Sequence, residues 1–293
     1  MQNIKKSFED MAFSAISYLF IIFVCIVTLY PIIFVVAASL SSAGSIMRNE
    51  VLLLPKEVTW RAYQVVVNYK GIWTAYANTL FYAILGTAIS VLLTAFAAYP
   101  LSRKSWAPRK FFSVFIVFTM WFSGGMIPFY LLIKNMGLLD SRIAILLYPA
   151  ISAFYVIIMR TYFEGIPDAI EESAKLDGAN DMVILFKIII PLSMPIIATI
   201  ALYYAVGRWN SFFWEMLILS DEKKLPVQVL LQRIILSSQL GQDIQKSLTR
   251  GEASIPITIK YACIVVTALP IIMVYPFAQK YFVKGVLVGG VKG

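Results

Sequence analysis

The sequence is organised around one polar stretch, Pro167-Asp-Ala-Ile-Glu-Glu-Ser-Ala-Lys-Leu-Asp-Gly-Ala-Asn-Asp181. Apolar segments long enough to cross a membrane lie on both sides of it. The stretch predicts a short helix, because proline suits its first position and acidic residues follow where the helix dipole favours them. Glu171 and Lys175 are spaced to pair on one face. Gly178 is suited to end this helix in a left-handed conformation, and Asn180 or the aspartate after it can cap a second helix.

The composition is that of an integral membrane protein. Of its 293 residues, 60% are hydrophobic and 14% are charged, against roughly 45–50% and about 25% in soluble domains. The net charge of +9 does not indicate nucleic-acid binding, because no basic strip is interleaved with aromatic residues. The basic residues are instead expected to keep loops in the cytoplasm and to contact anionic lipid. Cys25 and Cys263 fall in apolar segments, and the chain has no histidine. A disulfide framework, a His-based metal site and a histidine general base are therefore excluded.

Six apolar segments predict an all-α membrane protein with six transmembrane helices in one domain over 1–293. The short basic loop from Arg103 to Lys110 places that loop and both termini in the cytoplasm by the positive-inside rule. The polar stretch then belongs to a cytoplasmic loop at 164–190. The first segment is too long for a signal-peptide core and is expected to be retained. The six spans are expected at about 12–38, 76–99, 111–133, 143–163, 191–219 and 256–282.

The polar stretch resembles a signature of known importers. Glu172-Ser-Ala-x-x-Asp-Gly178-Ala, followed nine residues after the glycine by Ile188-x-Ile-Pro191, resembles the EAA signature of ABC importer permeases, Glu-Ala-Ala-x-x-x-Gly-x9-Ile-x-Leu-Pro. A Glu/Ala/Gly pattern alone would favour an ordinary amphipathic loop between two spans, but the full spacing, the closing proline and the place in a six-span chain favour the signature. The resemblance implies that the loop docks into a groove on a separate ATPase. The coupling residues it implies are Glu172, Ser173, Ala174, Asp177, Gly178, Ala179, Ile188 and Pro191.

Further motifs resemble permeases of the maltose and oligosaccharide type. They are Thr28-Leu-Tyr-Pro31, Ser123-Gly-Gly-Met-Ile-Pro128, Gly137-Leu-Leu-Asp140, Trp209-Asn210 with Phe212-Phe-Trp214, and Lys284-Gly-Val. The Gly-Gly-Met-Ile-Pro form is most similar to a subgroup that imports fragments of complex polysaccharides, for which an acidic fragment of alginate or pectin is one option. This resemblance covers nearly the whole chain and implies the type I ABC importer fold in a bacterial cytoplasmic membrane. The partners it implies are a second homologous permease in a heterodimer, two ATPase subunits carrying ATP and Mg, an extracytoplasmic solute-binding protein, an oligosaccharide and the lipid bilayer.

Candidate pathway residues lie in the fifth segment, and candidate hinge residues lie in the third. The pathway candidates are Arg208, Trp209, Asn210 and Trp214. An arginine within a membrane span must face protein, face water or reach the interface, and the tryptophans either stack on sugar rings or belong to an interfacial aromatic belt. The hinge candidates are Gly124, Gly125 and Pro128. They predict a kinked or broken helix, or a helix end followed by a re-entrant turn.

Two other classes of protein compete with the importer subunit. A stand-alone, ion-coupled secondary transporter would need intramembrane carboxylates, and Glu215 is the only one in the six segments. A membrane-embedded enzyme would need a histidine or a carboxylate pair there. The sequence contains no G-x-x-x-x-G-K-[ST] loop. Nucleotide hydrolysis must therefore come from another chain, and this chain is expected to be non-catalytic and to bind no cofactor or metal.

Overall fold

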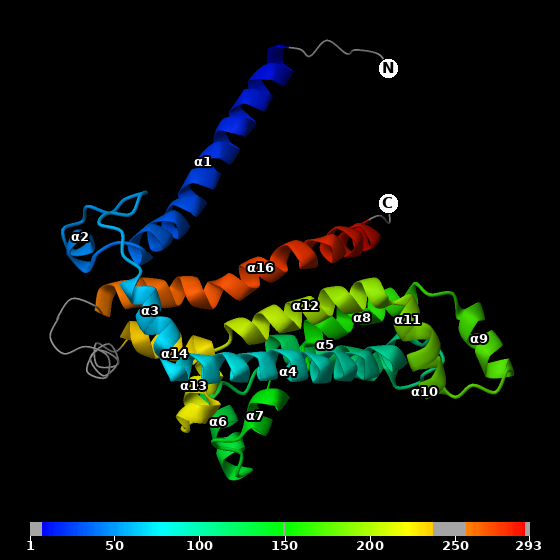
Figure 1. Ribbon diagram of the computed structural model, residues 1–293. Helices are drawn as coiled ribbons and strands as arrows, with labels where there is room; N and C mark the ends of the chain where they lie inside the picture. Colours follow the sequence, from blue (N-terminus) through cyan, green and yellow to red (C-terminus); the bar gives the residue numbers. More distant parts are fainter. Residues whose placement is uncertain (1–7, 149, 237–255, 291–293) are drawn as a thin grey trace. The chain divides into compact units, whose positions relative to one another are not determined.

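The computed structural model describes residues 8–148, 150–236 and 256–290, and within these ranges every regular element is helical (Figure 1). The chain divides into two compact units. Unit 1 holds residues 1–70 and 233–268, and unit 2 holds residues 71–232 and 269–293. The single membrane domain expected over 1–293 stays a prediction.

Unit 1 begins with the long apolar helix α1 (Phe8–Ser39). Most of its large apolar side chains are exposed, as expected of a helix that contacts lipid. The last turn of α1 is buried in a small cluster with Ile46 of the next helix and Val51 of the loop after it. The remaining helices of this unit are α2 (Ala43–Met47), α3 (Arg61–Asn68) and the first part of α16 (Pro256–Gly290).

Unit 2 contains the segments on which the functional argument depends. Its longest helix that lies wholly within the described residues is α4 (Lys70–Ser102), whose small side chains form the buried face, as expected where helices approach closely. The core packs α4 against α8, residues 184–189 and α12. The other helices are α5 (Arg109–Trp121), α6 (Met126–Asn135), α7 (Arg142–Leu147), α8 (Ala153–Glu164), α9 (Asp168–Leu176), α10 (Asp181–Ile184), α11 (Ile190–Leu192), α12 (Met194–Asn210), α13 (Phe213–Ile218) and the start of α14 (Val227–Leu236).

Three described helices are long and apolar enough to cross a membrane, in Met11–Ser39, Lys70–Ser102 and Ile257–Val274. Two bent helix pairs bring the number to as many as five, if each pair forms one span. They are α5 with α6, bent by 112°, and Asp181–Leu192 with α12, bent by 86°. The segment expected as a span at 143–163 contains two helices, with α7 ending at Leu147 and α8 beginning at Ala153. The count of six spans and the cytoplasmic termini stay predictions.

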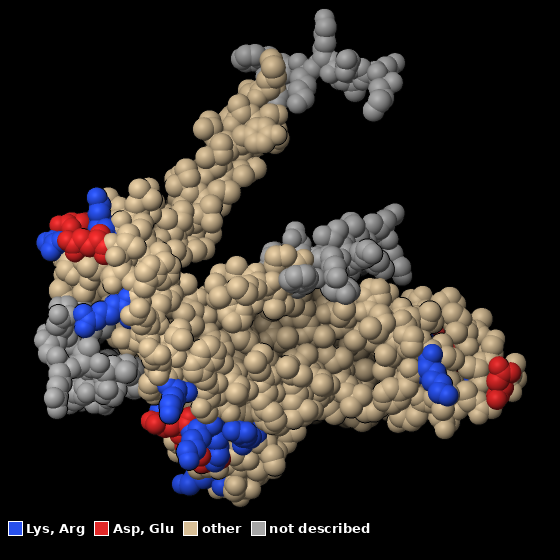
Figure 2. All heavy atoms as spheres, in the orientation of Figure 1, with Lys and Arg blue, Asp and Glu red and all other residues tan. Residues whose placement is uncertain are grey.

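Charged side chains in unit 2 gather at the two ends of its long helices. In Figure 2 they cluster around α6 and α7 at one end and around α9 at the other, with uncharged surface between them. Lys and Arg, Asp and Glu are expensive in hydrocarbon and are rare between membrane interfaces. An uncharged surface of this kind is expected of the part of a membrane protein that lies between the two interfaces.

The break between α5 and α6 lies where the sequence predicted it. Gly125 has φ of +82° and precedes α6 directly, and only glycine adopts this region without strain. Gly124, Gly125 and Pro128 are all exposed. The bend of 112° fits both expected forms, a broken span and a helix end followed by a re-entrant turn.

Candidate functional site

The helix predicted in the polar stretch is α9, which begins directly after Pro167. Its end has the hydrogen bonds of a Schellman motif: the N–H of Ala179 donates to the carbonyl of Ala174 (2.9 Å), and the N–H of Gly178 donates to that of Lys175 (3.0 Å). Gly178 has φ of +83°, as predicted. The side chain of Asn180 then caps α10 by accepting from the N–H of Val183 (2.9 Å). The turn between the two helices is therefore fixed by backbone hydrogen bonds.

One face of α9 is open to solvent. Leu176 is 89% exposed and Ile170 is 38% exposed, so an apolar pair lies on a short polar segment where no core covers it. Among the coupling residues implied by the signature, Glu172, Ser173, Asp177 and Gly178 are exposed. Ala174 and Ala179 instead pack partly buried against the core of unit 2. Ala174 is one helical turn from Ile170, so it lies at the boundary between this exposed face and the core.

The end of the signature forms a distorted turn that the sequence analysis did not predict. Residues 185–189 are a π-helix, an element that is rare and frequent at functional sites. Ile188 is half-buried within it, and Pro191 is exposed just beyond it. Because Pro191 has no N–H, it cannot continue the α-helical hydrogen bonding, and this proline was the available sequence signal. The chain then bends by 86° before α12.

A buried ion pair joins α9 to the end of α4. One carboxylate oxygen of Glu171 lies 3.0 Å from the guanidinium of Arg103, and the other lies 2.9 Å from the ammonium of Lys175. The side chains of Arg103 and Glu171 are both only 9% exposed, whereas Lys175 is half-exposed. The hydrogen bond with Glu171 raises the pKa of Lys175. Sequence spacing predicted the pair of Glu171 with Lys175 but missed Arg103, because nothing local relates residues so distant in the chain.

Arg208 is enclosed by protein in this structure. It is 7% exposed, and its guanidinium donates to the carbonyls of Ile145 (3.1 Å) and Leu146 (3.0 Å) and to the hydroxyl of Ser90 (3.0 Å). Both carbonyls belong to the last turn of α7, where helices leave carbonyl groups without partners and favour positive charge. Arg208 therefore joins α12 to α4 and α7, and its guanidinium binds protein groups in this structure.

The other pathway candidates have different environments. Trp209 is buried, and its ring lies 6.2 Å from that of Tyr76, whereas Asn210 is exposed. Trp214 is half-buried in an aromatic cluster with Phe129 and Tyr148, at ring distances of 4.7 and 5.1 Å. The structure therefore brings Trp214 together with two aromatic residues that the sequence analysis did not single out. Of the two tryptophans, Trp214 is the more accessible to a sugar ring in this conformation.

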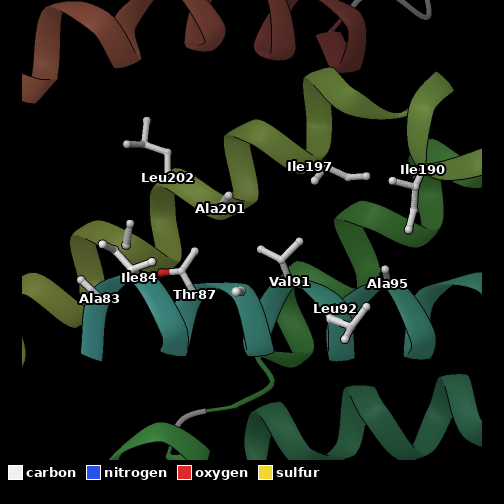
Figure 3. A pocket seen from close by; sticks show the side chains of 12 residues that line it. Ala83, Ile84, Thr87, Val91, Leu92, Ala95, Ile190, Ile197, Ala201 and Leu202 are labelled. Atoms are coloured by element: carbon white, nitrogen blue, oxygen red, sulfur yellow. The ribbon is translucent and has the colours of Figure 1, made fainter. Parts of the chain in front are cut away.

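An apolar groove of about 630 Å³ lies between α4 and α12 (Figure 3). Alanine and branched aliphatic side chains line it, and Thr87 is the one polar side chain among the described residues around it. The hydroxyl groups of a sugar need hydrogen-bond partners when they leave water. The groove therefore suits apolar groups and is a poor sugar site.

Apolar helices with charged ends define a multi-pass membrane protein, and a short exposed helix is fixed on its polar loop. Residues 70–288 match the family described as binding-protein-dependent transport system inner membrane components, and the chain belongs to this family. It is thus a permease component of ABC importers.

Similar proteins share nearly the full length of the chain. It is 42% identical over 285 residues, 97% of this chain and 100% of the relative, to the polygalacturonan/rhamnogalacturonan transport system permease protein YtcP of Bacillus subtilis (strain 168). It is 37% identical to the protein LplC of the same organism, over 96% of this chain and 95% of the relative. Its fold is similar to a chain in the crystal structure of a bacterial ABC transporter involved in the import of the acidic polysaccharide alginate. The TM-score is 0.86 at 40% identity, over 94% of this chain and 99% of that one.

Proposed function

We propose that this chain is one of two permease subunits in an ATP-driven importer that brings an oligosaccharide, released from a complex polysaccharide, across a bacterial cytoplasmic membrane. The observation that carries the proposal is the exposed helix α9, with its apolar pair Ile170 and Leu176 and its glycine-ended turn, in a chain of this family. Such a helix gives a separate ATPase a preformed surface to bind.

The substrate is an acidic oligosaccharide. The support comes from two similar proteins, one named for the transport of polygalacturonan and one crystallised from an alginate importer. Both of these polymers are built from uronic acids, so their fragments carry a carboxylate on each sugar. The pathway must contain water or polar groups, because the hydroxyl and carboxylate groups of such a sugar cannot cross hydrocarbon without hydrogen-bond partners. The exposed Asn210 and the aromatic cluster of Trp214 are the contacts that this chain would offer.

The importer works as an assembly of separate chains. A second, homologous permease forms a heterodimer with this one, two ATPase subunits bind ATP and Mg, and an extracytoplasmic binding protein delivers the sugar. This chain crosses the membrane six times with both termini in the cytoplasm, and it performs no hydrolysis itself. Closure of the ATPases moves the paired coupling helices, and alternating access follows by rigid-body motion around a central site.

Uptake in reconstituted vesicles tests the proposal. With all partners present, a labelled galacturonan oligosaccharide should accumulate in an ATP-dependent manner, and uptake should vanish when the binding protein is omitted. A neutral malto-oligosaccharide of equal length is the matched control and should accumulate far more slowly. Equal uptake of both would overturn the acidic substrate. Uptake by this chain alone, driven by a proton or sodium gradient, would overturn the importer and favour the secondary transporter.

A further inference from the structure

Helix α4 is continuous over 33 residues, about 50 Å at 1.5 Å per residue. It is also one of the three described helices long and apolar enough to cross a membrane alone. Its two ends therefore lie on opposite sides of the bilayer. Each end is held by a separate set of polar contacts, and both sets lie within unit 2.

The cytoplasmic end of α4 is attached to the coupling helix. Arg103, the residue directly after α4, forms the buried ion pair with Glu171 of α9, and it lies 3.9 Å from Asp168 in the first turn of α9. The Arg103 guanidinium also donates to the carbonyl of Phe163 near the end of α8 (3.4 Å) and lies over the ring of Tyr99 in α4. Arg103 therefore fixes α9 against the ends of two long helices at once.

The opposite end of α4 is attached to residues 223–227, between α13 and α14. The amide of Asn78 donates to the carbonyls of Lys223 (2.8 Å) and Leu225 (3.1 Å), and the hydroxyl of Tyr82 donates to that of Lys224 (2.9 Å). The hydroxyl of Thr79 accepts from the N–H of Val227 (2.8 Å). Four hydrogen bonds from one face of α4 thus hold this short segment of backbone.

The same segment is held to the loop before α7. The carboxylate of Asp140 accepts from the backbone N–H groups of Ser220 and Asp221 (both 3.0 Å) and from the ammonium of Lys224 (2.7 Å). Arg142 donates to the side-chain oxygen of Asn78 (2.9 Å). Residues 220–227 are therefore a structured, multiply bonded element and respond as a unit when α4 moves.

We propose that α4 transmits displacement of the coupling helix to residues 220–227 on the far side of the membrane, and that the Arg103–Glu171 ion pair is the contact through which α4 takes up that displacement. The inference rests on the proposed function. Arg103 and Glu171 are positioning residues here, since they act by holding α4 and α9 together. A covalent connection alone would not transmit the motion, because α9 is separated from α4 by four other helical elements in the chain. The ion pair resists separation, because pulling it apart takes the nearest carboxylate away from the buried guanidinium of Arg103.

The test uses the complete importer in vesicles and compares two substitutions of the same kind at the same end of unit 2. Glu171→Gln removes the charge that Arg103 meets. Glu164→Gln is the matched control, because Glu164 pairs with Arg109 and Arg160 and makes no ion pair with α4 or α9. We expect Glu171→Gln to lower the sugar taken up per ATP hydrolysed by on the order of tenfold, a typical coupling effect. Glu164→Gln should leave that ratio unchanged, and both variants should retain the ATPase in the purified complex.

A fluorophore at the far end distinguishes transmission from a general loss of assembly. It is attached to Lys223→Cys, an exposed position, in a background with Cys25→Ser and Cys263→Ala. In the complex without further substitutions, the fluorescence emission should change when ATP and vanadate trap the ATPases in their closed state. Glu171→Gln or Arg103→Gln should abolish this change. Asn78→Ala should lower the uptake ratio too, with no further loss when combined with Glu171→Gln, because the two contacts act in series.

The outcomes separate this inference from the proposed function. A complex with active wild-type uptake, in which Glu171→Gln keeps the normal ratio and the normal fluorescence response, would overturn the role of α4 and leave the importer intact. Additive losses from Asn78→Ala and Glu171→Gln would also overturn it. A wild-type complex that takes up no sugar would overturn the proposed function, while the fluorescence response would still report on α4.

Discussion

The enclosure of Arg208 makes Gly86 of α4 sensitive to a single added methyl group. A Cβ atom at Gly86 would lie 2.4 Å from the Arg208 guanidinium nitrogen Nη1 and 2.5 Å from its Cζ, far inside van der Waals contact. The guanidinium cannot move aside without losing its bonds to Ser90, Ile145 and Leu146. Gly86→Ala should therefore disrupt the contact between α4, α7 and α12.

The size of the effect follows from these contacts. Three hydrogen bonds at about 0.6 kcal/mol each, the average within membrane proteins, amount to about 2 kcal/mol. Overpacking adds about 1–3 kcal/mol, and the better helix propensity of alanine returns up to about 1 kcal/mol. The free energy of unfolding of the Gly86→Ala chain should thus fall by about 2–5 kcal/mol.

Denaturation of the purified chain in mixed micelles, followed by circular dichroism, measures this loss. Gly207→Ala is the matched control, because no atom lies within 4 Å of a Cβ there, and it should be neutral or slightly stabilising. Arg208→Met in the Gly86→Ala chain should recover part of the loss by removing the obstructing group. Equal stability of Gly86→Ala and wild type would refute the placement of Arg208 described above.

Three further predictions concern the two ends of the molecule. Gly178→Val should reduce uptake without reducing the amount of chain in the membrane, because a side chain in the left-handed region costs about 1–2 kcal/mol and redirects α9; an unchanged uptake assay would contradict the coupling role. The hydrogen bond from Lys224, and to a smaller extent those from two backbone N–H groups, hold the pKa of Asp140 at about 2, below its usual 3.8. The contribution of the Asp140 carboxylate to stability should therefore be complete above about pH 4 and be lost as the pH falls through about 2. Asp140→Asn should remove that dependence from an acid titration of stability, and an unchanged titration would rule out this carboxylate as the cause. In intact cells an impermeant thiol reagent should label Leu240→Cys but not Ser105→Cys, and the reverse pattern would invert the topology.

The ends of α9 could be predicted from sequence because their causes are local. A proline before the first turn, a pair at i and i+4, a glycine after the last turn and an asparagine cap each act within a few residues. The break at Gly125 was predictable for the same reason. Such features need no knowledge of what else lies nearby in space.

The contacts between helices could not be predicted in this way. Arg208 binds backbone carbonyls of α7. Every residue has such a carbonyl, so the sequence does not show which ones the arginine binds. The contacts of Arg103 with Glu171 and of Asn78 with residues 223–225 depend on how distant segments pack. One local signal was overlooked: Pro149 lies inside the segment expected as a single span, and a proline in a helix interior breaks or kinks it. The structure accordingly has separate helices α7 and α8.

The nine residues of α9 extend for only about 13 Å. A helix of that length offers far less surface than the roughly 800 Å² per partner that stable protein complexes bury. One such helix can hold an ATPase only weakly and briefly. In the proposed importer, two such helices carried by two joined permeases would raise the effective concentration of each for its own site. The ATPases should thus be retained through avidity, and a membrane that receives only one of the two permeases should leave them in the cytosol.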